Sequence, residues 1–257
     1  LKVTRQEHLL AHWKLDEELY SSARDAEGGY HGTLVDLVNL GPSNSWTRGI
    51  FSNGLDLGNP AGRVELGSVP FDGAFTLSLW LSSQDVNGSK STILAKDGLQ
   101  GMNLFNLHKD SGSGVVVFSF FGDGNSTAFD LNSSTSVLKQ DEWVNLAVTF
   151  DGNSTLTMYA DAVQVAQTTG LAISGMPLDQ RFSNLKLGSS VDPVDALIDD
   201  LRVYTSSLSV ADLSKIFGQG GGDFNQLELI GSGTTKIVAS QNGNDFFAQA
   251  VPVPNYL

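Results

Sequence analysis

The chain has no cysteine and little positive charge, since 15 lysines and arginines stand against 28 aspartates and glutamates. Without cysteine there is no disulfide framework, no thiol nucleophile and no thiolate ligand for zinc. The formal net charge of −13 leaves no basic surface for nucleic acid or for an anionic membrane. No stretch approaches the roughly 20 apolar residues of a membrane span. We therefore expect neither nucleic acid nor membrane insertion among the partners of this protein.

Histidine and glutamate are also scarce, with four and seven residues. No pair of histidines has the spacing of a zinc site, and no serine lies in a nucleophile-elbow motif. The two adjacent aspartates Asp199 and Asp200 point to opposite faces of an ideal strand, so they cannot act on one bond. These patterns disfavour an enzyme.

Short apolar runs alternate with turn clusters every 8–15 residues between positions 12 and 205, which is typical of a β-sandwich. Dipeptides such as Asp97-Gly98 and Asp151-Gly152 mark the turns. No long crossover helices separate the runs, so we predict an all-β fold. The predicted strands are residues 64–66, 75–81, 92–96, 103–108, 114–121, 127–132, 143–150, 156–160, 163–168, 185–188 and 197–204.

The last of these strands leads into the one predicted helix. In an ideal strand, Leu197, Asp199, Leu201 and Val203 share one face, and the residues between them share the other. Asp199 would then lie among aliphatic side chains, where a carboxylate needs a partner, often a cation. The helix follows at once: Ser209 can cap it, Asp212 lies in its first turn, and its apolar contacts are Leu208, Leu213, Ile216 and Phe217.

Six ordered blocks span residues 12–217: His12–Glu17, Ala23–Leu34, Gly73–Leu81, Thr92–Lys96, Glu142–Gly152 and Ala196–Phe217. Together they resemble a bacterial laminin G-like domain of the concanavalin A-like lectin/glucanase superfamily. The resemblance implies a jelly-roll sandwich of two antiparallel sheets, and a binding module often stabilised by calcium; the short C-terminal helix predicted above would complete the fold. The chain departs from the family pattern at Tyr159-Ala-Asp-Ala162, where the hairpin turn lacks its glycine.

By this resemblance, a structural calcium ion would join the N-terminal loop to the last strand through Asp25 and Asp199, with Asp16 or Glu27 as a third ligand. The alternative is that Asp25 caps a turn and Asp199 accepts a hydrogen bond from a neighbouring strand. A calcium site at the rim of the sandwich, using Asp97 or Asp141, is a further possibility. The glucanases of the superfamily use a Glu-x-Asp-x-x-Glu strand, which this chain lacks.

Sugar rings stack on aromatic side chains, but most aromatic candidates here lie in predicted strands and are more typical of a core. No specific glycan site can be identified from them. The candidates are Trp46, Trp80, Trp143, Tyr159 and the turn Phe120-Phe121-Gly-Asp-Gly124.

The C-terminal residues form a separate unit. We place the laminin G-like domain at 1–217, a Gly-rich linker at 218–222 and a small β appendage at 223–257 with strands at 227–230, 235–240 and 246–252. The appendage resembles half of a bacterial immunoglobulin-like repeat, and two or three strands cannot bury a core alone. It is expected to dock on the sandwich or to pair with another protein chain.

We therefore predict a non-catalytic carbohydrate-binding module of a large secreted or cell-surface bacterial protein, with calcium as a structural ion. Its partner would be a polysaccharide or the glycan of a glycoprotein. The alternative is a structural or adhesive module that contacts proteins and binds no glycan. A glycoside hydrolase is a distant third.

Overall fold

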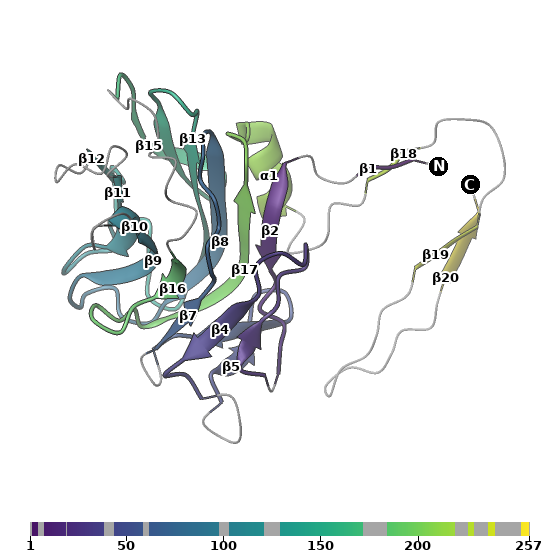
Figure 1. The fold of residues 1–257 in the computed structure, drawn as a ribbon, viewed down its shortest axis with the longest axis horizontal. Coiled ribbons are helices and arrows are strands. Elements are labelled where there is room, and N and C mark those ends of the chain that lie inside the picture. Colours follow the sequence, from purple (N-terminus) through teal and green to yellow (C-terminus); the bar gives the residue numbers. More distant parts are fainter. Residues whose placement is uncertain are drawn as a thin grey trace. The chain divides into compact units, whose positions relative to one another are not determined.

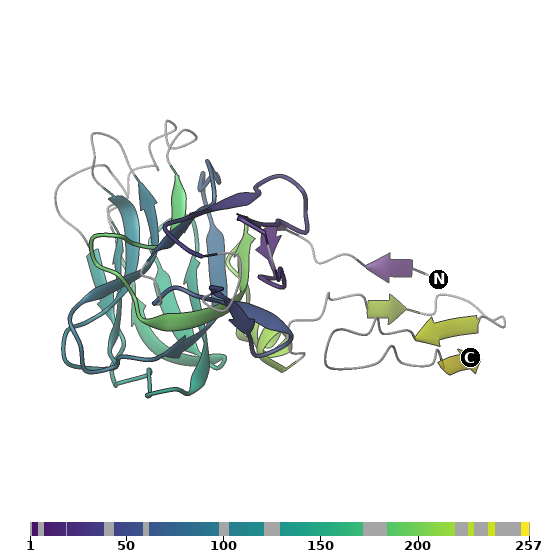
Figure 2. The same cartoon turned by 90° about the horizontal axis from the view of Figure 1, so that it is seen from below.

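The inner faces of two antiparallel β-sheets pack against each other and form the core of the main unit, residues 8–222 (Figures 1 and 2). The computed structural model describes residues 2–4, 8–18, 20–38, 44–58, 62–97, 103–120, 129–171, 184–218, 226–228, 236–239 and 253–256. Within these residues, no helix has the length and hydropathy that crossing a membrane would need. The predicted all-β sandwich is confirmed.

The two sheets are named here sheet I and sheet II, and each has eight strands in the described part of the chain. Sheet I has the order β12 (Phe129–Asn132), β11 (Val116–Phe120), β10 (Asn103–Lys109), β9 (Ser91–Asp97), β16 (Leu185–Gly188), β7 (Arg63–Glu65), β4 (Gly32–Val35) and β3 (Ser22–Ala23). Sheet II has the order β15 (Val163–Thr168), β14 (Leu156–Ala160), β13 (Trp143–Phe150), β8 (Phe75–Ser83), β17 (Ala196–Tyr204), β6 (Asn53–Asp56) and β5 (Trp46–Arg48), and β2 (Leu9–Trp13) also pairs with β17.

Aromatic rings from both sheets meet around Phe75 at the centre of the core. Phe75 and Phe150 come from sheet II, and Phe105, Phe118 and Phe120 come from sheet I. The ring of Phe75 has its centroid 5.6–6.4 Å from those of the other four. Each fully buried phenylalanine stabilises the fold by roughly 1.5–3 kcal/mol. This packing fixes which face of each strand points outward.

A β-bulge in β17 changes the predicted alternation of that strand. Asp199 pairs with Trp80 and Arg202 pairs with Ser78, so β17 has one more residue than β8 over this interval. Asp200 adopts φ of 53°, a left-handed conformation that aspartate tolerates better than most residues.

Because of the bulge, the core contains Ile198 together with Leu201 and Val203. The prediction that Asp199 shares a face with Leu201 and Val203 was therefore wrong. The outward-facing residues of this strand, including Asp199, do not lie among the aliphatic residues of the core.

The single α-helix of the described residues, α1 (Val210–Gly218), packs on the outer face of sheet II. Its start agrees with the prediction, because the Ser209 hydroxyl accepts a hydrogen bond from the amide of Asp212 at 3.2 Å. Leu213 and Ile216 are buried, and the ring of Phe217 stacks on Trp80 at 5.6 Å. The helix therefore covers part of this face.

The chain ends form a second unit of residues 1–7 and 223–257. In it, β1 (Lys2–Thr4) pairs with β18 (Gln226–Glu228), and β19 (Lys236–Ala239) pairs with β20 (Val253–Tyr256). Residues 1–7 were predicted to belong to the sandwich domain, and the structure groups them with the C-terminal segment instead. The linker residues 219–222 and the predicted strand 246–252 lie outside the described residues. The resemblance to an immunoglobulin-like repeat stays a prediction.

The hairpin between β14 and β15 turns without the glycine that its geometry favours. Asp161 and Ala162 have φ of 52° and 60°, as in a type I′ turn. The carboxylate of Asp161 accepts a hydrogen bond from the amide of Asn145 at 2.9 Å, which holds the turn against β13. Ala162 lacks such a side-chain contact and bears the cost of the left-handed conformation.

Substitution of Ala162→Gly is expected to raise the free energy of unfolding by about 1 kcal/mol, because glycine adopts this φ without a Cβ clash. Urea unfolding measures the change. Ala211→Gly, in the exposed part of α1, is the matched control and should lower stability by up to about 1 kcal/mol. Equal destabilisation by both substitutions would contradict this account of the turn.

Candidate functional site

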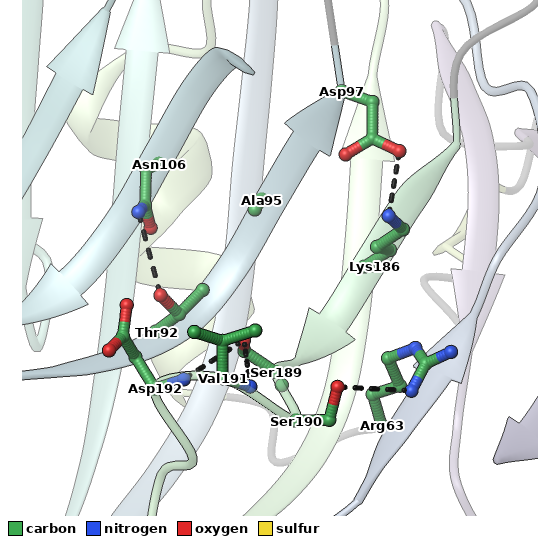
Figure 3. A pocket seen from close by; sticks show the side chains of 11 residues that line it. Arg63, Thr92, Ala95, Asp97, Asn106, Lys186, Ser189, Ser190, Val191 and Asp192 are labelled. Carbon is green, nitrogen blue, oxygen red and sulfur yellow. Dashed lines mark hydrogen bonds and ion pairs between the residues drawn. The ribbon is translucent and has the colours of Figure 1, made fainter. Parts of the chain in front are cut away.

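A polar groove of about 350 Å³ lies on the outer face of sheet I (Figure 3). This volume falls at the lower end of the roughly 300–1,000 Å³ typical of small-molecule sites. The outer face is polar because the alternate residues of the same strands, such as Val64 and Leu187, are buried in the core. The groove is lined by Arg63, Thr92, Ala95, Asp97, Asn106, Lys186 and residues 188–192.

Asn106 supplies an incompletely satisfied amide to the groove. Its Nδ2 donates a long hydrogen bond of 3.5 Å to the hydroxyl of Thr92, and its Oδ1 is buried without a partner. If the amide were turned over, Nδ2 would be the unpartnered end, so the protein satisfies only one end in either orientation. Buried polar atoms normally have partners, and an exception of this kind points to a ligand or a water molecule.

His108 lies two residues further along β10, on the same face as Asn106. Its Nδ1 is also buried without a hydrogen-bond partner. Burial lowers the pKa of His108, with a smaller contribution from the charge of Lys90. The imidazole is therefore neutral at physiological pH and offers one donor and one acceptor.

Three of the four charged residues that line the groove, Arg63, Asp97 and Lys186, are held in ion pairs. The ammonium of Lys186 lies 2.7 Å from Asp97 Oδ2, and Nε of Arg63 lies 2.6 Å from Glu65 Oε1. The guanidinium also contacts the hydroxyl of Ser190 at 3.3 Å, which joins β7 to the loop that follows β16. These contacts fix the polar groups in place.

A second pocket, of about 440 Å³, shares Val191 and Asp192 with the groove. Its wall includes Lys109, whose buried ammonium donates to the carbonyl oxygens of Val86, Gly88, Ser89 and Asp110 at 2.9–3.4 Å. The protein thus supplies its own cation to this ring of carbonyls, and the ammonium orders the loop around residues 86–89.

Asp25, predicted as a calcium ligand, organises its own loop instead. Its Oδ1 accepts hydrogen bonds from the amides of His12 and Glu27 at 2.8 and 3.0 Å. Its Oδ2 accepts from the amides of Gly29 and Tyr30 at 2.9 and 3.0 Å. Four backbone donors occupy the oxygens of this buried carboxylate, so its contacts match the alternative interpretation, in which Asp25 caps a turn.

Asp199 holds a different loop. Its Oδ2 accepts hydrogen bonds from the amides of Ile50 and Phe51 at 2.9 and 3.2 Å. Burial, with smaller contributions from the charges of Asp200 and Asp16, raises the pKa of Asp199 to about 8. Asp16 itself is exposed, and its carboxylate accepts from the amide of Asn53 at 3.3 Å.

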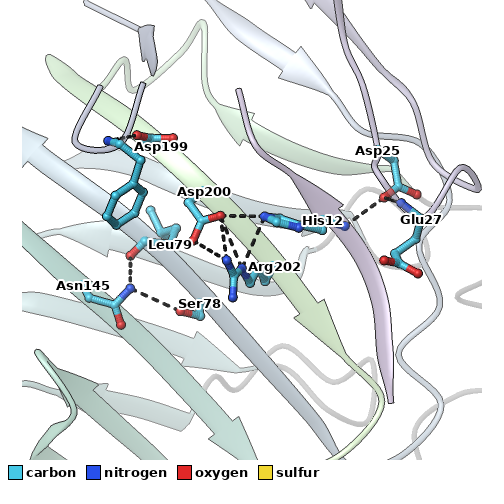
Figure 4. Close-up of polar contacts among 10 residues, drawn as sticks. His12, Asp25, Glu27, Ser78, Leu79, Asn145, Asp199, Asp200 and Arg202 are labelled. Atoms are coloured by element: carbon cyan, nitrogen blue, oxygen red, sulfur yellow. Dashed lines mark hydrogen bonds and ion pairs between the residues drawn. The ribbon is translucent and has the colours of Figure 1, made fainter. Parts of the chain in front are cut away.

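Sequence reasoning missed a buried charge cluster on the same strand. Asp200 Oδ1 lies 2.6 Å from Nε2 of His12, and Asp200 Oδ2 lies 3.1 Å from the guanidinium of Arg202 (Figure 4). Although burial opposes it, the hydrogen bond with His12 and the charge of Arg202 lower the pKa of Asp200. The cluster ties β2 to β17. The only signal in the sequence was His12 followed by Trp13 in a predicted strand. This pattern does not indicate that His12 pairs with Asp200.

The predicted calcium ligands do not form one site. Figure 4 shows Asp25 and Asp199 on opposite sides of the pair formed by His12 and Asp200. Among the described residues, no group of three histidine, aspartate or glutamate side chains is arranged to hold a metal. The carboxylates of Asp16, Asp25 and Asp199 therefore do not fit the shared calcium site, and calcium binding elsewhere stays a prediction.

Most of the aromatic residues considered as sugar-stacking candidates pack within the protein. Trp46 is buried and donates to the carbonyl of Tyr20 at 2.7 Å, and Trp80 packs between Phe51 and Phe217. Phe120 belongs to the core, and residues 121–124 lie outside the described part of the chain. Tyr159 is buried and Trp143 is half-buried. None of these named residues lines the groove, and of the two rim candidates only Asp97 does.

Comparison with known proteins gives a family and a fold. Residues 57–214, more than half of the chain, match the family model described as the concanavalin A-like lectin/glucanases superfamily. A search of the curated proteins found no match.

Several solved structures share the fold at low sequence identity. Domain 4 of an extracellular arabinanase from Geobacillus stearothermophilus, in complex with arabinotriose, has a TM-score of 0.62 and 18% identity, covering 84% of this chain and 99% of that domain. The ligand-binding domain of botulinum neurotoxin serotype D, in complex with N-acetylneuraminic acid, has a TM-score of 0.62 and 14% identity, covering 82% of this chain. The present chain spans about half the length of that toxin chain. A sialidase from Trypanosoma rangeli has a TM-score of 0.55 and 13% identity, covering 81% of this chain and 32% of the enzyme.

Substitution of Asp25→Asn should lower the free energy of unfolding by about 3 kcal/mol, because an amide nitrogen cannot accept the two backbone hydrogen bonds that one oxygen now accepts. The loss should be the same in millimolar calcium and in chelator, as measured by thermal and urea unfolding. Asp72→Asn, at an exposed position, is the control and should change stability by less than about 0.5 kcal/mol. A loss that appears only in calcium would show that Asp25 acts through a metal.

Asp199→Asn tests the pH dependence. The folded-state pKa of about 8 lies above the unfolded value near 3.8, so the folded state binds the extra proton and the carboxyl lowers stability as pH rises through this window. The amide keeps an acceptor for Ile50 and Phe51 and has no charge to desolvate. We expect the stability of Asp199→Asn relative to the original chain to increase from pH 4 to pH 8, by at most about 1.4 kcal/mol per pH unit. A constant difference across this range would contradict the raised pKa.

Proposed function

The chain belongs to the concanavalin A-like lectin/glucanase superfamily, and we propose that it is a non-catalytic module that binds carbohydrate in the groove of sheet I. The observation that carries the proposal is the Asn106 amide, which lines the groove with one end unpartnered. A sugar hydroxyl can donate and accept at once, so it suits either end of this amide.

The composition of the groove favours a hydroxylated ligand over an apolar one. Thr92 and Ser190 add hydroxyl groups next to the Asn106 amide, and Ala95 and Gly188 leave room above the strands. The ion pairs of Arg63 and Lys186 hold donors and acceptors in fixed positions. A prearranged set of polar groups lowers the entropic cost of binding.

The arrangement of carboxylates supports binding without catalysis. Retaining glycosidases place two carboxyl groups about 5–5.5 Å apart across the bond that they cleave. The carboxylates that line the groove come from Asp97 on β9 and Asp192 in the loop after β16. Asp97 is engaged by Lys186, and the chain has no Glu-x-Asp-x-x-Glu strand.

Structures of the same fold add support from their ligands. The arabinanase domain was solved with arabinotriose, and the neurotoxin domain with N-acetylneuraminic acid. On this basis we extend the proposal to a module of a secreted or cell-surface bacterial protein that binds a polysaccharide or a glycoprotein glycan. Calcium would act, if bound, as a structural ion, since the groove supplies polar contacts from its own side chains.

A structural or adhesive module is the second candidate. Strand β15 forms one edge of sheet II, and Val163 on it is 65% exposed. An exposed edge strand can pair with another chain. The second unit, which pairs β1 with β18, offers further strands for such contacts.

A glycan array probed with the purified chain, in calcium and in chelator, tests the proposal. We expect binding in both buffers, and Asn106→Ala should weaken it at least about tenfold, the loss of roughly one hydrogen bond of 1.4 kcal/mol. Asn153→Ala, in the exposed turn after β13, is the control and should bind normally. A blank array in both buffers would contradict glycan binding and favour the adhesive module, and unchanged binding by Asn106→Ala would contradict the groove as its site.

A further inference from the structure

We propose that the groove selects neutral glycans and rejects acidic ones. This inference rests on the proposed function, because it assigns a ligand class to the same groove. It follows from how each cation that lines the groove is already paired.

The charge of Lys186 is neutralised by Asp97. Its ammonium lies 2.7 Å from Asp97 Oδ2 on the adjacent strand β9, and both side chains line the groove. Figure 3 shows the two side chains pointing toward each other. A sugar carboxylate could reach this ammonium only by displacing Asp97 or by sitting next to its negative charge.

Arg63 is paired in the same way. Its Nε lies 2.6 Å from Glu65 Oε1, and its Nη1 lies 3.4 Å from Asp36 Oδ2 and 3.3 Å from the hydroxyl of Ser190. A guanidinium recognises an acidic sugar by presenting two parallel N–H groups to the carboxylate. Here Glu65 engages Nε, and Asp36 and Ser190 engage Nη1, so a sugar carboxylate would have to compete with at least one of these acceptors for a bidentate contact.

The remaining charge of the groove is negative. Asp192 also lines it, and no ion pair of Asp192 occurs among the described residues. His108, on the same face, is neutral because burial lowers its pKa. The net charge of −13 adds a long-range repulsion of anions. Neutral hydroxyl groups meet no such cost and can bond to the paired charges and to the Asn106 amide.

Matched oligosaccharides separate the two classes. Neutral oligosaccharides and their counterparts oxidised to uronic acids, or capped with sialic acid, are placed on one array and titrated by calorimetry. We expect the original chain to bind at least one neutral member, and to bind its acidic counterpart at least tenfold more weakly. Asp97→Asn releases Lys186 and should raise the ratio of acidic to neutral affinity severalfold.

Glu142→Gln is the matched control. It removes the same charge and releases Lys139 from an exposed ion pair of 3.2 Å, outside the residues that line the groove. Acidic binding should not increase in this variant, and thermal unfolding checks that both variants fold.

The possible results are distinct. Equal or tighter binding of acidic glycans by the original chain would overturn the inference and leave the proposed function intact. Equal behaviour of Asp97→Asn and Glu142→Gln would overturn the role given to the ion pair of Lys186. The absence of binding to every glycan would remove the proposed function, and the inference with it.

Discussion

The burial of the two inner sheet faces against each other is the constraint on which the rest of the structure depends. Phe75 contacts rings from both sheets, and this core fixes the direction of every alternate side chain. Once the apolar residues of β7, β9, β10 and β16 point inward, most of their polar neighbours line the opposite face; the buried Lys96, whose ammonium lies 6.0 Å from the centre of the Phe71 ring, is an exception. The strand residues of the groove thus follow directly from core packing, and residues 189–192 of the loop after β16 complete its lining.

The outer faces of the two sheets then have different roles. On sheet II, α1 covers Trp80, and Asp199 and Asp200 bond to the loop of Ile50 and Phe51 and to His12. These polar groups stabilise the fold, because each hydrogen bond joins segments that are far apart in the sequence. On sheet I, Asn106 and His108 keep buried atoms without partners. Trp80 Nε1 and Asp200 Oδ2 on sheet II are also buried without a hydrogen-bond partner, but Trp80 is covered by Phe51 and Phe217 and Asp200 is paired with Arg202. Asn106 differs because it lies at an open groove.

Much of the fold could be predicted from sequence, because strand periodicity and turn residues are local signals. Strands β13, β14, β15 and β16 have the predicted bounds, and Ser209 caps the predicted helix. The bulge at Asp200 could not be predicted from the sequence, because Leu197, Leu201 and Val203 also fit the regular alternation of an unbroken strand. The left-handed conformation of Asp200 is visible only in the structure. The groove was missed because sheet order, not spacing along the chain, brings Arg63, Asn106 and Lys186 together. Asp25 looked like a metal ligand because a carboxylate that binds four backbone amides has the same sequence pattern.

The central claim is that the outer face of sheet I is the binding surface. Nuclear magnetic resonance mapping of backbone amide shifts, during titration with a neutral oligosaccharide that binds on an array, tests it most directly. The account predicts that the largest shifts fall on residues 92–97, 106–108 and 186–192. Shifts confined to the strands of sheet II, or to the paired chain ends, would contradict it.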